Sequence, residues 1–180
     1  MYDISELHSR HSWEKDGDEI TLLDITLPRL GGVPKHVNAY YLLLEKRLKA
    51  FCRRRARAGD RSVYKADYTA ALLGDDHISI YCDISRDGLV RARTACTWDA
   101  VTGYPLPLGH FTALSRRAVI GLIDRQIKNE RYPIFFKDAV RRLSRFYDPD
   151  NFWIDEKGIW FFYQPLCLAP VEYGVQCFLL

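Results

Sequence analysis

The sequence contains no long hydrophobic run. No stretch approaches the roughly 18–20 consecutive apolar residues that a membrane-spanning helix requires. The N-terminal residues are polar, where a secretion signal would be apolar. The expectation for the chain as it stands is a soluble cytoplasmic protein without a membrane span; it would be extracytoplasmic if a leader had been removed.

Charge of one sign is not in large excess. The 26 Lys and Arg residues nearly balance the 23 Asp and Glu residues, which leaves a net charge of +3. A nucleic-acid or anionic-membrane partner would call for a strongly basic or clustered composition. The balance does not call for a nucleic-acid partner, which we regard as disfavoured, and it says little about other partners.

Closely spaced cysteines are also missing. The five cysteines are odd in number, widely separated and without a Cys-x-x-Cys pair: Cys52, Cys82, Cys96, Cys167 and Cys177. A disulfide framework or a zinc site calls for closer or more regular spacing. We therefore expect buried, reduced thiols.

Common catalytic motifs are absent as well. The sequence has no Gly-x-Ser-x-Gly, no His-Glu-x-x-His, no P-loop and no dinucleotide-binding fingerprint. His8 and His11 could bind a metal with Asp16 or Asp18, but the segment lacks helical periodicity and a third fixed ligand, which favours a mobile surface pair. The Asp-Asp-His stretch at 75–77 is typical of a hairpin tip. We predict no catalytic residue, no metal site and no cofactor, and favour a non-enzymatic role.

The length and hydrophobic content predict one substantial core. The chain has 180 residues, of which 48% are hydrophobic. We expect a single α+β domain over 19–180, preceded by a loosely held lead-in at 1–18. Apolar residues recur every three or four positions over 34–58, which predicts a long helix with Gly59 as its stop signal.

Strand patterns flank this helix, one before it and three after it: 19–27, 62–73, 78–84 and 89–98. The last two patterns lie on either side of Asp87-Gly88, a pair typical of a hairpin turn. The three later strands therefore predict an antiparallel meander. Helical patterns follow at 111–130 and 135–146, separated at Pro133.

The C-terminal segment reads as two apolar strands joined by a proline-rich bend. Residues 158–164 are dense in aromatic and β-branched side chains, Pro165 ends that run, and 173–180 forms the second strand. The predicted order is β-α-β-β-β-α-α-β-β, with strands in runs. This order indicates an α+β fold, mainly antiparallel, with one long helix in the N-terminal half and a helix pair packed on the sheet.

The bend between these last strands is the first candidate for a partner-binding surface. Its aromatic, proline and acidic residues are Tyr163, Pro165, Pro170, Glu172 and Tyr173. Bends between strands are places where a rigid scaffold presents binding groups, and tyrosine offers a large contact area at low entropic cost. The alternative interpretation is that these residues only end strand pairing and fill the edge of the core.

A basic run at the end of the long helix is the second candidate. Arg53, Arg54, Arg55 and Arg57 could bind phosphates or another acidic partner through bidentate guanidinium contacts. A solvated helix end is the alternative, because the helix dipole alone favours cations there. Other basic residues on the two later helices would extend this surface if they lay beside it: Lys128, Arg131, Lys137, Arg141, Arg142 and Arg145.

Four short motifs together resemble a family of bacterial domains of unknown function. They are the strand at 20–28, Val37-Asn38 at the start of the long helix, the turn Trp98-Asp99-Ala100-Val101-Thr102-Gly103, and the C-terminal pattern of aromatic strand, Pro, Ala-Pro, Gly and strand. The family forms the lysozyme-sensing ectodomain of the anti-sigma factor that controls sigma-V, and it is appended to some peptidoglycan deacetylases. At 89–96 this sequence reads Leu-Val-Arg-Ala-Arg-Thr-Ala-Cys, where the family usually carries Gly-Gly-Ala-His.

The resemblance implies a non-catalytic binding or sensing module for an envelope-related protein such as lysozyme, or for a cell-wall glycan. The membrane helix and the sigma-binding segment of the anti-sigma relatives are not seen in this chain, so signalling to a sigma factor is not carried over. One alternative is an accessory part of a cell-wall glycan deacetylase or hydrolase, since the family's enzymes keep catalysis in a separate domain. Another is an intracellular protein with an acidic or nucleic-acid partner.

Overall fold

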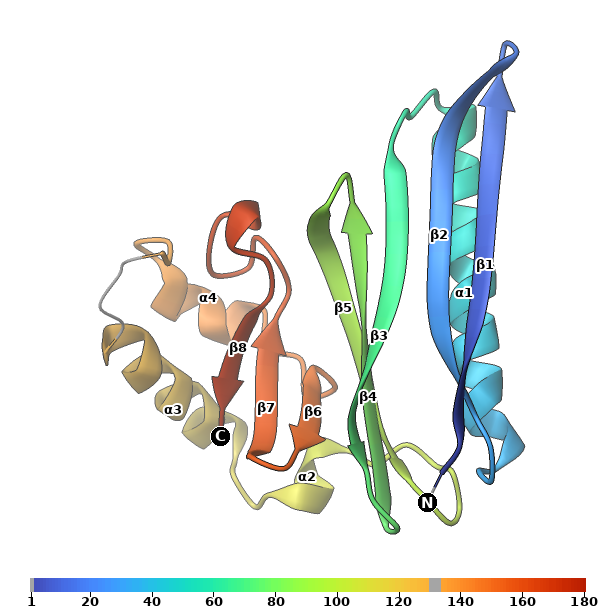
Figure 1. The fold of residues 1–180 in the computed structure, drawn as a ribbon. Coiled ribbons are helices and arrows are strands. Elements are labelled where there is room, and N and C mark those ends of the chain that lie inside the picture. Colours follow the sequence, from blue (N-terminus) through green and yellow to red (C-terminus); the bar gives the residue numbers. More distant parts are fainter. Residues whose placement is uncertain (1, 130–133) are drawn as a thin grey trace.

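The larger of two sheets contains five strands in chain order (Figure 1). The computed structural model describes residues 2–129 and 134–180. The strands of this sheet are β1 (Ile4–Lys15), β2 (Asp18–Leu30), β3 (Val63–Leu73), β4 (His77–Arg86) and β5 (Leu89–Asp99). Neighbours are antiparallel except β2 and β3, which run parallel and are connected through helix α1 (Lys35–Arg57). The predicted α+β class and the antiparallel meander are confirmed.

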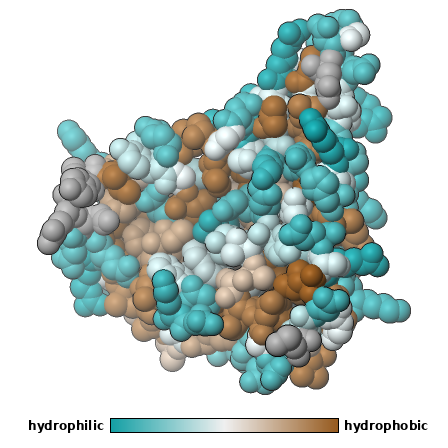
Figure 2. Space-filling view, viewed as in Figure 1, coloured by the Kyte–Doolittle hydropathy of each residue, from teal (hydrophilic) through white to brown (hydrophobic). Residues whose placement is uncertain are grey.

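Residues 4–15 form β1 where the sequence predicted a loosely held lead-in. β1 pairs with β2 along its whole length, and Asp16 and Gly17 turn the chain between them. The strand was missed because its inward face includes polar Ser9 and His11, so no clean alternation of apolar residues marks it. The projecting end of this hairpin is mainly hydrophilic (Figure 2).

Helix α1 packs on one face of the larger sheet, chiefly against β2 (Figure 1). Its buried residues recur at helical spacing: Val37, Tyr41, Glu45, Leu48, Cys52 and Ala56. The buried Glu45 is satisfied by Ser9 Oγ at 3.0 Å and Lys49 Nζ at 2.6 Å. The helix begins and ends within one residue of the predicted bounds, because a continuous apolar stripe and a glycine stop signal define it.

The C-terminal part forms a second sheet of three strands, in the order β6-β7-β8. They are β6 (Phe152–Asp155), β7 (Gly158–Tyr163) and β8 (Gln176–Leu179). Three helices precede them: α2 (Leu108–Phe111), α3 (Arg116–Asn129) and α4 (Ala139–Arg145). A second hydrophobic core joins α3 and α4 to this smaller sheet (Figure 1), with Val119, Leu143, Phe161, Leu168 and Phe178 among its members.

The two predicted C-terminal strands are confirmed as β7 and β8, which pair antiparallel. β6 was not predicted because its four residues are too short a run to show a period. The predicted helix at 111–130 begins only at Arg116, and the one at 135–146 is shortened to Ala139–Arg145. Residues 130–133, which include Arg131 and the predicted break at Pro133, lie outside the described residues.

Arg93 lies where the two sheets meet. Its guanidinium pairs with Asp83 of β4 through two hydrogen bonds, of 2.7 and 2.6 Å, and lies 4.1 Å from the ring centre of Tyr81. The Trp153 ring of β6 packs on the same tyrosine, with centroids 5.0 Å apart, and Arg93 Nη1 also donates to Cys177 Sγ of β8 at 3.4 Å. One partly buried cation therefore contacts strands of both sheets.

Gly103 allows a close approach between the turn after β5 and the start of α1. Its φ is +70°, and a Cβ built there would lie 2.7 Å from Pro34 Cβ. We predict that Gly103→Ala lowers the free energy of unfolding by more than about 2 kcal/mol, because left-handed backbone costs an alanine about 1–2 kcal/mol and the overlap adds to it. Urea unfolding followed by tryptophan fluorescence measures the loss.

Gly88→Ala is the matched control. Gly88 has a φ of +79° but no atom of the described residues within 4 Å of the built Cβ, so this variant has only the cost of the left-handed backbone. Equal losses in the two variants would show that the contact with Pro34 is not restrictive.

Candidate functional site

The end of α1 folds back so that Asp60 lies against the helix. Gly59 has a φ of +83°, and its N–H donates to the Ala56 carbonyl at 2.8 Å. The Asp60 N–H donates to the Arg55 carbonyl at 3.1 Å. These two bonds are the Schellman pattern, in which a left-handed glycine satisfies the last helical carbonyls. The motif fixes the Asp60 carboxylate between the helix end and the start of β3.

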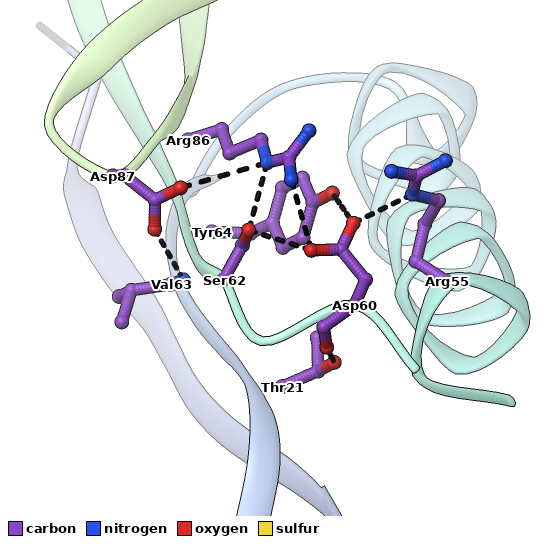
Figure 3. A network of polar contacts seen from close by, with 8 residues as sticks. All are labelled: Thr21, Arg55, Asp60, Ser62, Val63, Tyr64, Arg86 and Asp87. Carbon is purple, nitrogen blue, oxygen red and sulfur yellow. Dashed lines mark hydrogen bonds and ion pairs between the residues drawn. The ribbon is translucent and has the colours of Figure 1, made fainter. Parts of the chain in front are cut away.

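The Asp60 carboxylate accepts hydrogen bonds from four side chains (Figure 3). Oδ2 accepts from Arg55 Nε at 2.7 Å and from Tyr64 OH at 2.9 Å. Oδ1 accepts from Ser62 Oγ at 2.6 Å and from Arg86 Nη2 at 2.9 Å. The aspartate side chain is only 5% exposed. These residues, which we name the Asp60 cluster, connect α1, β3 and the end of β4.

Hydrogen bonding holds Asp60 in its charged form. Burial by itself would raise the pKa of the carboxyl group. Hydrogen bonds from Ser62, Arg55 and Tyr64, with the charge of Arg86, outweigh burial and lower the pKa to about 2. Asp60 is therefore ionised at neutral pH and balances one of the two guanidinium charges beside it.

An open groove of about 590 Å³ adjoins the Asp60 cluster. We name it the arginine groove; its lining residues are Leu48, Phe51, Arg55, Tyr64, Ile84, Arg86, Arg91 and Ala92. Phe51 is 41% exposed and stands edge-on against the Tyr64 ring, with centroids 5.6 Å apart. The groove thus combines an accessible apolar floor with guanidinium groups.

A β-bulge aims Arg91 into this groove. Ile84 lies opposite Ala92, whereas Ser85 lies opposite Val90, so Arg91 is the extra residue of β5. A bulge turns a side chain away from the normal alternation, which lets Arg91 and Ala92 line the same groove although they are consecutive. Arg91 is exposed and forms no ion pair with any acidic residue of the described chain.

The groove carries a net positive charge. Arg55 and Arg86 share Asp60, and Arg86 Nε also lies 3.5 Å from an oxygen of Asp87. Arg91 adds a third guanidinium. Guanidinium groups bind carboxylates and phosphates through paired hydrogen bonds. The arrangement can therefore hold an acidic group whose apolar neighbour rests on the floor.

Of the four arginines predicted as a basic surface, only Arg55 lines the groove. Arg53, Arg54 and Arg57 are exposed on the last turns of α1. The later basic residues on α3 and α4 do not extend this surface, because these helices lie beside the smaller sheet, away from α1 (Figure 1). The predicted basic helix end therefore contributes one residue to a site completed by β4 and β5.

The predicted aromatic and proline surface is divided by the structure. Tyr163 is fully buried, and its hydroxyl donates to the Leu143 carbonyl at 2.9 Å. It fills the second core and cannot contact a partner at the surface, so the alternative interpretation applies to it. Pro165 and Pro170 are partly buried.

Glu172 and Tyr173 do reach the surface. They lie in a short 3₁₀ turn, Val171–Tyr173, that lies beside β5. Gln176 Nε2 donates to the Tyr173 carbonyl at 2.8 Å, which fixes the turn to the start of β8. Tyr173 is 50% exposed. These two residues remain a candidate contact surface.

The histidine candidates lie apart. His8 is exposed on β1, with Nε2 3.6 Å from Asp24 Oδ1, whereas His11 points to the other face and is partly buried. His77 begins β4 and stacks on Phe111, with ring centroids 5.1 Å apart. Over residues 2–129 and 134–180, no three His, Cys, Asp or Glu side chains are placed to hold a metal.

The five cysteines are free thiols, of which Cys52 and Cys82 are fully buried. Burial raises the pKa of Cys52 to about 11 and that of Cys82 to about 12, and nearby Asp60 and Asp83 add to these rises. Both groups are therefore protonated at neutral pH, as expected for thiols that pack as small apolar side chains.

Solved structures match the chain over nearly its whole length. A DUF3298 family protein from Pseudomonas aeruginosa superimposes with a TM-score of 0.67 at 13% identity, over 98% of this chain and 89% of the other. A DUF3298 family member from Bacteroides fragilis gives a TM-score of 0.63, also at 13% identity, over 99% and 90%. The chain has the fold of DUF3298 family proteins.

This finding confirms the resemblance drawn from the sequence at the level of the fold. No family model matches the sequence, and no curated protein does. Among the described residues of this DUF3298 fold, no helix is both long enough and apolar enough to cross a membrane.

Sequence reasoning missed the carboxylate that organises the arginine groove in this DUF3298 fold. A signal for Asp60 was present, since a glycine helix stop predicts that the next residue returns to the last turn. The Asp87-Gly88 turn predicts the β4–β5 hairpin that carries Arg86. No sequence signal identifies Arg91, because its direction depends on a bulge that only the paired strands reveal.

We predict that Asp60→Asn lowers the free energy of unfolding by about 2–3 kcal/mol near neutral pH, because it leaves Arg55 and Arg86 without their carboxylate. The difference from the parent protein should be constant above the ordinary pKa of 3.8. It should shrink as the pH falls towards 2, where the folded-state carboxyl group is itself protonated. Urea unfolding at several pH values measures both effects.

Asp75→Asn is the control, since Asp75 is exposed at the β3–β4 turn and should cost less than about 0.5 kcal/mol. A loss for Asp60→Asn that does not change with pH would contradict the assigned role of the Asp60 charge.

Proposed function

We propose that the protein is a non-catalytic binding module whose arginine groove takes an acidic segment of a partner protein, with an apolar side chain next to the acid. The observation that carries this proposal is Arg91, which the bulge aims into a groove floored by Phe51 and Tyr64. An exposed guanidinium without an acidic partner is available to bind one, and the floor offers apolar area beside it.

The Asp60 cluster prepares the groove for binding. Arg55 and Arg86 are held on the same carboxylate, so their side chains lose little freedom when a ligand arrives. Asp60 accepts one hydrogen bond from each guanidinium, and Arg86 Nε donates to Ser62 Oγ at 2.8 Å, so Nη1 of Arg86 and both Nη groups of Arg55 stay available. Two positioned arginines and one free arginine therefore surround the same space.

Size and charge favour a short peptide segment over nucleic acid. A volume of about 590 Å³ accommodates a few side chains. Nucleic acid would require a basic stripe that follows several phosphates, and two of the three groove arginines already share an aspartate.

A second candidate function rests on the exposed Glu172 and Tyr173. Their turn is fixed by hydrogen bonds and presents an aromatic side chain, as contact surfaces often do. The family resemblance suggests that the partner of this surface is an envelope-related protein such as lysozyme, or a cell-wall glycan.

The first test measures binding of the fluorescently labelled, end-blocked peptide Glu-Asp-Phe-Glu-Asp by fluorescence anisotropy in about 150 mM salt, where charges beyond about 8 Å are screened. We expect Arg91→Glu to weaken binding by about tenfold or more, because a charge-assisted contact is replaced by repulsion. Arg53→Glu makes the same charge change on an exposed arginine outside the groove, and should change affinity by less than about threefold.

A second peptide, with alanine in place of phenylalanine, tests the apolar floor and should also bind more weakly. If Arg91→Glu and Arg53→Glu lost affinity equally, and the two peptides bound equally well, the proposal of a specific groove would be wrong. The binding would then be a diffuse electrostatic attraction to a basic surface. In that case, retention on heparin that falls steeply with salt would point to a nucleic-acid partner.

The second candidate is tested by calorimetric titration against lysozyme and against soluble peptidoglycan fragments. If either binds, Tyr173→Ala should weaken the affinity by about tenfold, because a half-exposed interface tyrosine contributes roughly 1–2 kcal/mol. Tyr104→Ala is the control, since Tyr104 is more exposed and lies in the turn after β5. Saturable binding that both variants leave unchanged would exclude the Glu172–Tyr173 surface.

A further inference from the structure

The outer edge of β5 is capped at its first half by an amide side chain. β5 is the last strand of the larger sheet, so one of its edges has no neighbouring strand among residues 2–129 and 134–180. The Arg93 N–H donates to Gln164 Oε1 at 2.9 Å, and Gln164 Nε2 donates to the Arg93 carbonyl at 2.7 Å. The glutamine amide thus takes the place that a peptide group of another strand would occupy.

The second half of this edge is capped by the loop after β5. The Leu106 N–H donates to the Thr97 carbonyl at 2.8 Å, and the Asp99 N–H donates to the Tyr104 carbonyl at 2.9 Å. Between these bonds, Trp98 and Pro105 form an isolated antiparallel bridge. A strand-like partner is therefore present here too.

Ala95 lies between the two caps and has none. Backbone groups of every second residue in a strand point to the same edge, so Ala95 points outward with Arg93 and Thr97. No backbone or side-chain group of the described residues bonds to the Ala95 N–H or carbonyl on that side. An unpaired donor and acceptor in a sheet edge form a template for an added strand.

Space for such a strand is present beside Ala95. A groove of about 450 Å³ follows the middle of β5, between the loop at 105–107 and the segment before β6 that carries Asp148 and Asp150. Neither carboxylate forms an ion pair within the described chain. Asp150 and Cys96 both line this groove.

We propose that an extended segment of a partner polypeptide adds to β5 at Ala95. One of its residues exchanges two backbone hydrogen bonds with Ala95, as Gln164 does with Arg93. The next residue along points to the Cys96 face, where a lysine or arginine would meet Asp150. The partner segment is therefore extended and carries a basic side chain beside the paired position.

A second copy of this chain fits the site less well. The groove is closed by the Gln164 cap and by the loop at 105–107, so only a short stretch of backbone can approach. The other free edge of the larger sheet is β1, a strand of 12 residues inside a long hairpin. A short extended segment fits between the two caps. A long hairpin edge such as β1 would clash with both of them.

Amide hydrogen exchange measured by NMR on the intact chain tests the open position directly. Thr94 and Cys96 point towards β4, so their amides should be protected, while the Ala95 amide should exchange at least about 100-fold faster. The probe is the end-blocked peptide Thr-Lys-Val-Lys-Thr. We expect it to shift the Ala95 amide resonance and to slow its exchange.

The matched control is the same peptide with an N-methyl group on the valine nitrogen, which removes one backbone donor and keeps every side chain. It should bind at least about fivefold more weakly, the loss of one hydrogen bond. Ala95→Pro removes the donor on the protein side, and proline is tolerated at edge positions. The methylated peptide keeps the test valid if that variant does not fold.

Three outcomes would overturn the proposal: protection of the Ala95 amide in the free chain, equal binding of the two peptides, or no change at Ala95 at millimolar peptide. A dependence of Ala95 exchange on protein concentration alone would assign the edge to a second copy and reject a partner segment.

Discussion

The ion pair between Arg93 and Asp83 connects β4 to β5, the strand that borders both proposed grooves. Arg93 is 12% exposed and forms two hydrogen bonds, of 2.7 and 2.6 Å, with Asp83. A buried cation is costly unless its donors are satisfied, and here a carboxylate, the Tyr81 ring and the Cys177 sulfur surround it. The carboxylate and the tyrosine ring belong to β4 of the same sheet as Arg93, and docking of the smaller sheet adds the Cys177 sulfur and the Trp153 ring.

Strand β5, which carries Arg93, therefore has three different surroundings. One face packs towards the smaller sheet through Arg93. The other face, with Ala92 and the bulged Arg91, borders the arginine groove. Its outer edge is capped at Arg93 and Thr97 and open at Ala95. The docking that buries Arg93 also brings Gln164 and the 148–152 segment to this edge, so the same contact that stabilises the fold shapes the groove beside Ala95.

The sequence predicted correctly those elements that are defined by residues close together in the chain. Helix α1 was found because its apolar stripe is continuous and Gly59 stops it, and the β4–β5 hairpin because Asp87-Gly88 favours its turn. β1 was missed because its inward face carries Ser9 and His11. Its inward face is buried by pairing with β2 and by packing under α1. These are tertiary contacts, and the hydrophobic pattern of the segment itself does not reveal them.

The candidate site was predicted less completely for a related reason. Arg55 was nominated from a basic helix end, but its partner Asp60 interacts with Arg86, which lies 26 residues away in sequence. That contact requires β3 to pair parallel with β2 and antiparallel with β4. Tyr163 was nominated as a surface residue because aromatic residues suit both interfaces and cores, and only its contact with Leu143 assigns it to the core.

The fold is shared with DUF3298 family proteins, whereas the proposed sites depend on individual residues of this chain. The DUF3298 fold places α1, the five-stranded sheet and the C-terminal sheet in this arrangement, and a likeness at 13% identity extends to the fold alone. Arg91 and Ala95 both lie in the stretch 89–96, where this sequence departs from the Gly-Gly-Ala-His usual in the family it resembles. Arg91 supplies the bulged guanidinium of the arginine groove, whereas the pairing proposed at Ala95 uses backbone groups that every residue except proline carries. The shared architecture therefore accounts for the position of β5, and the proposed arginine groove depends on a side chain that a likeness in fold does not carry over.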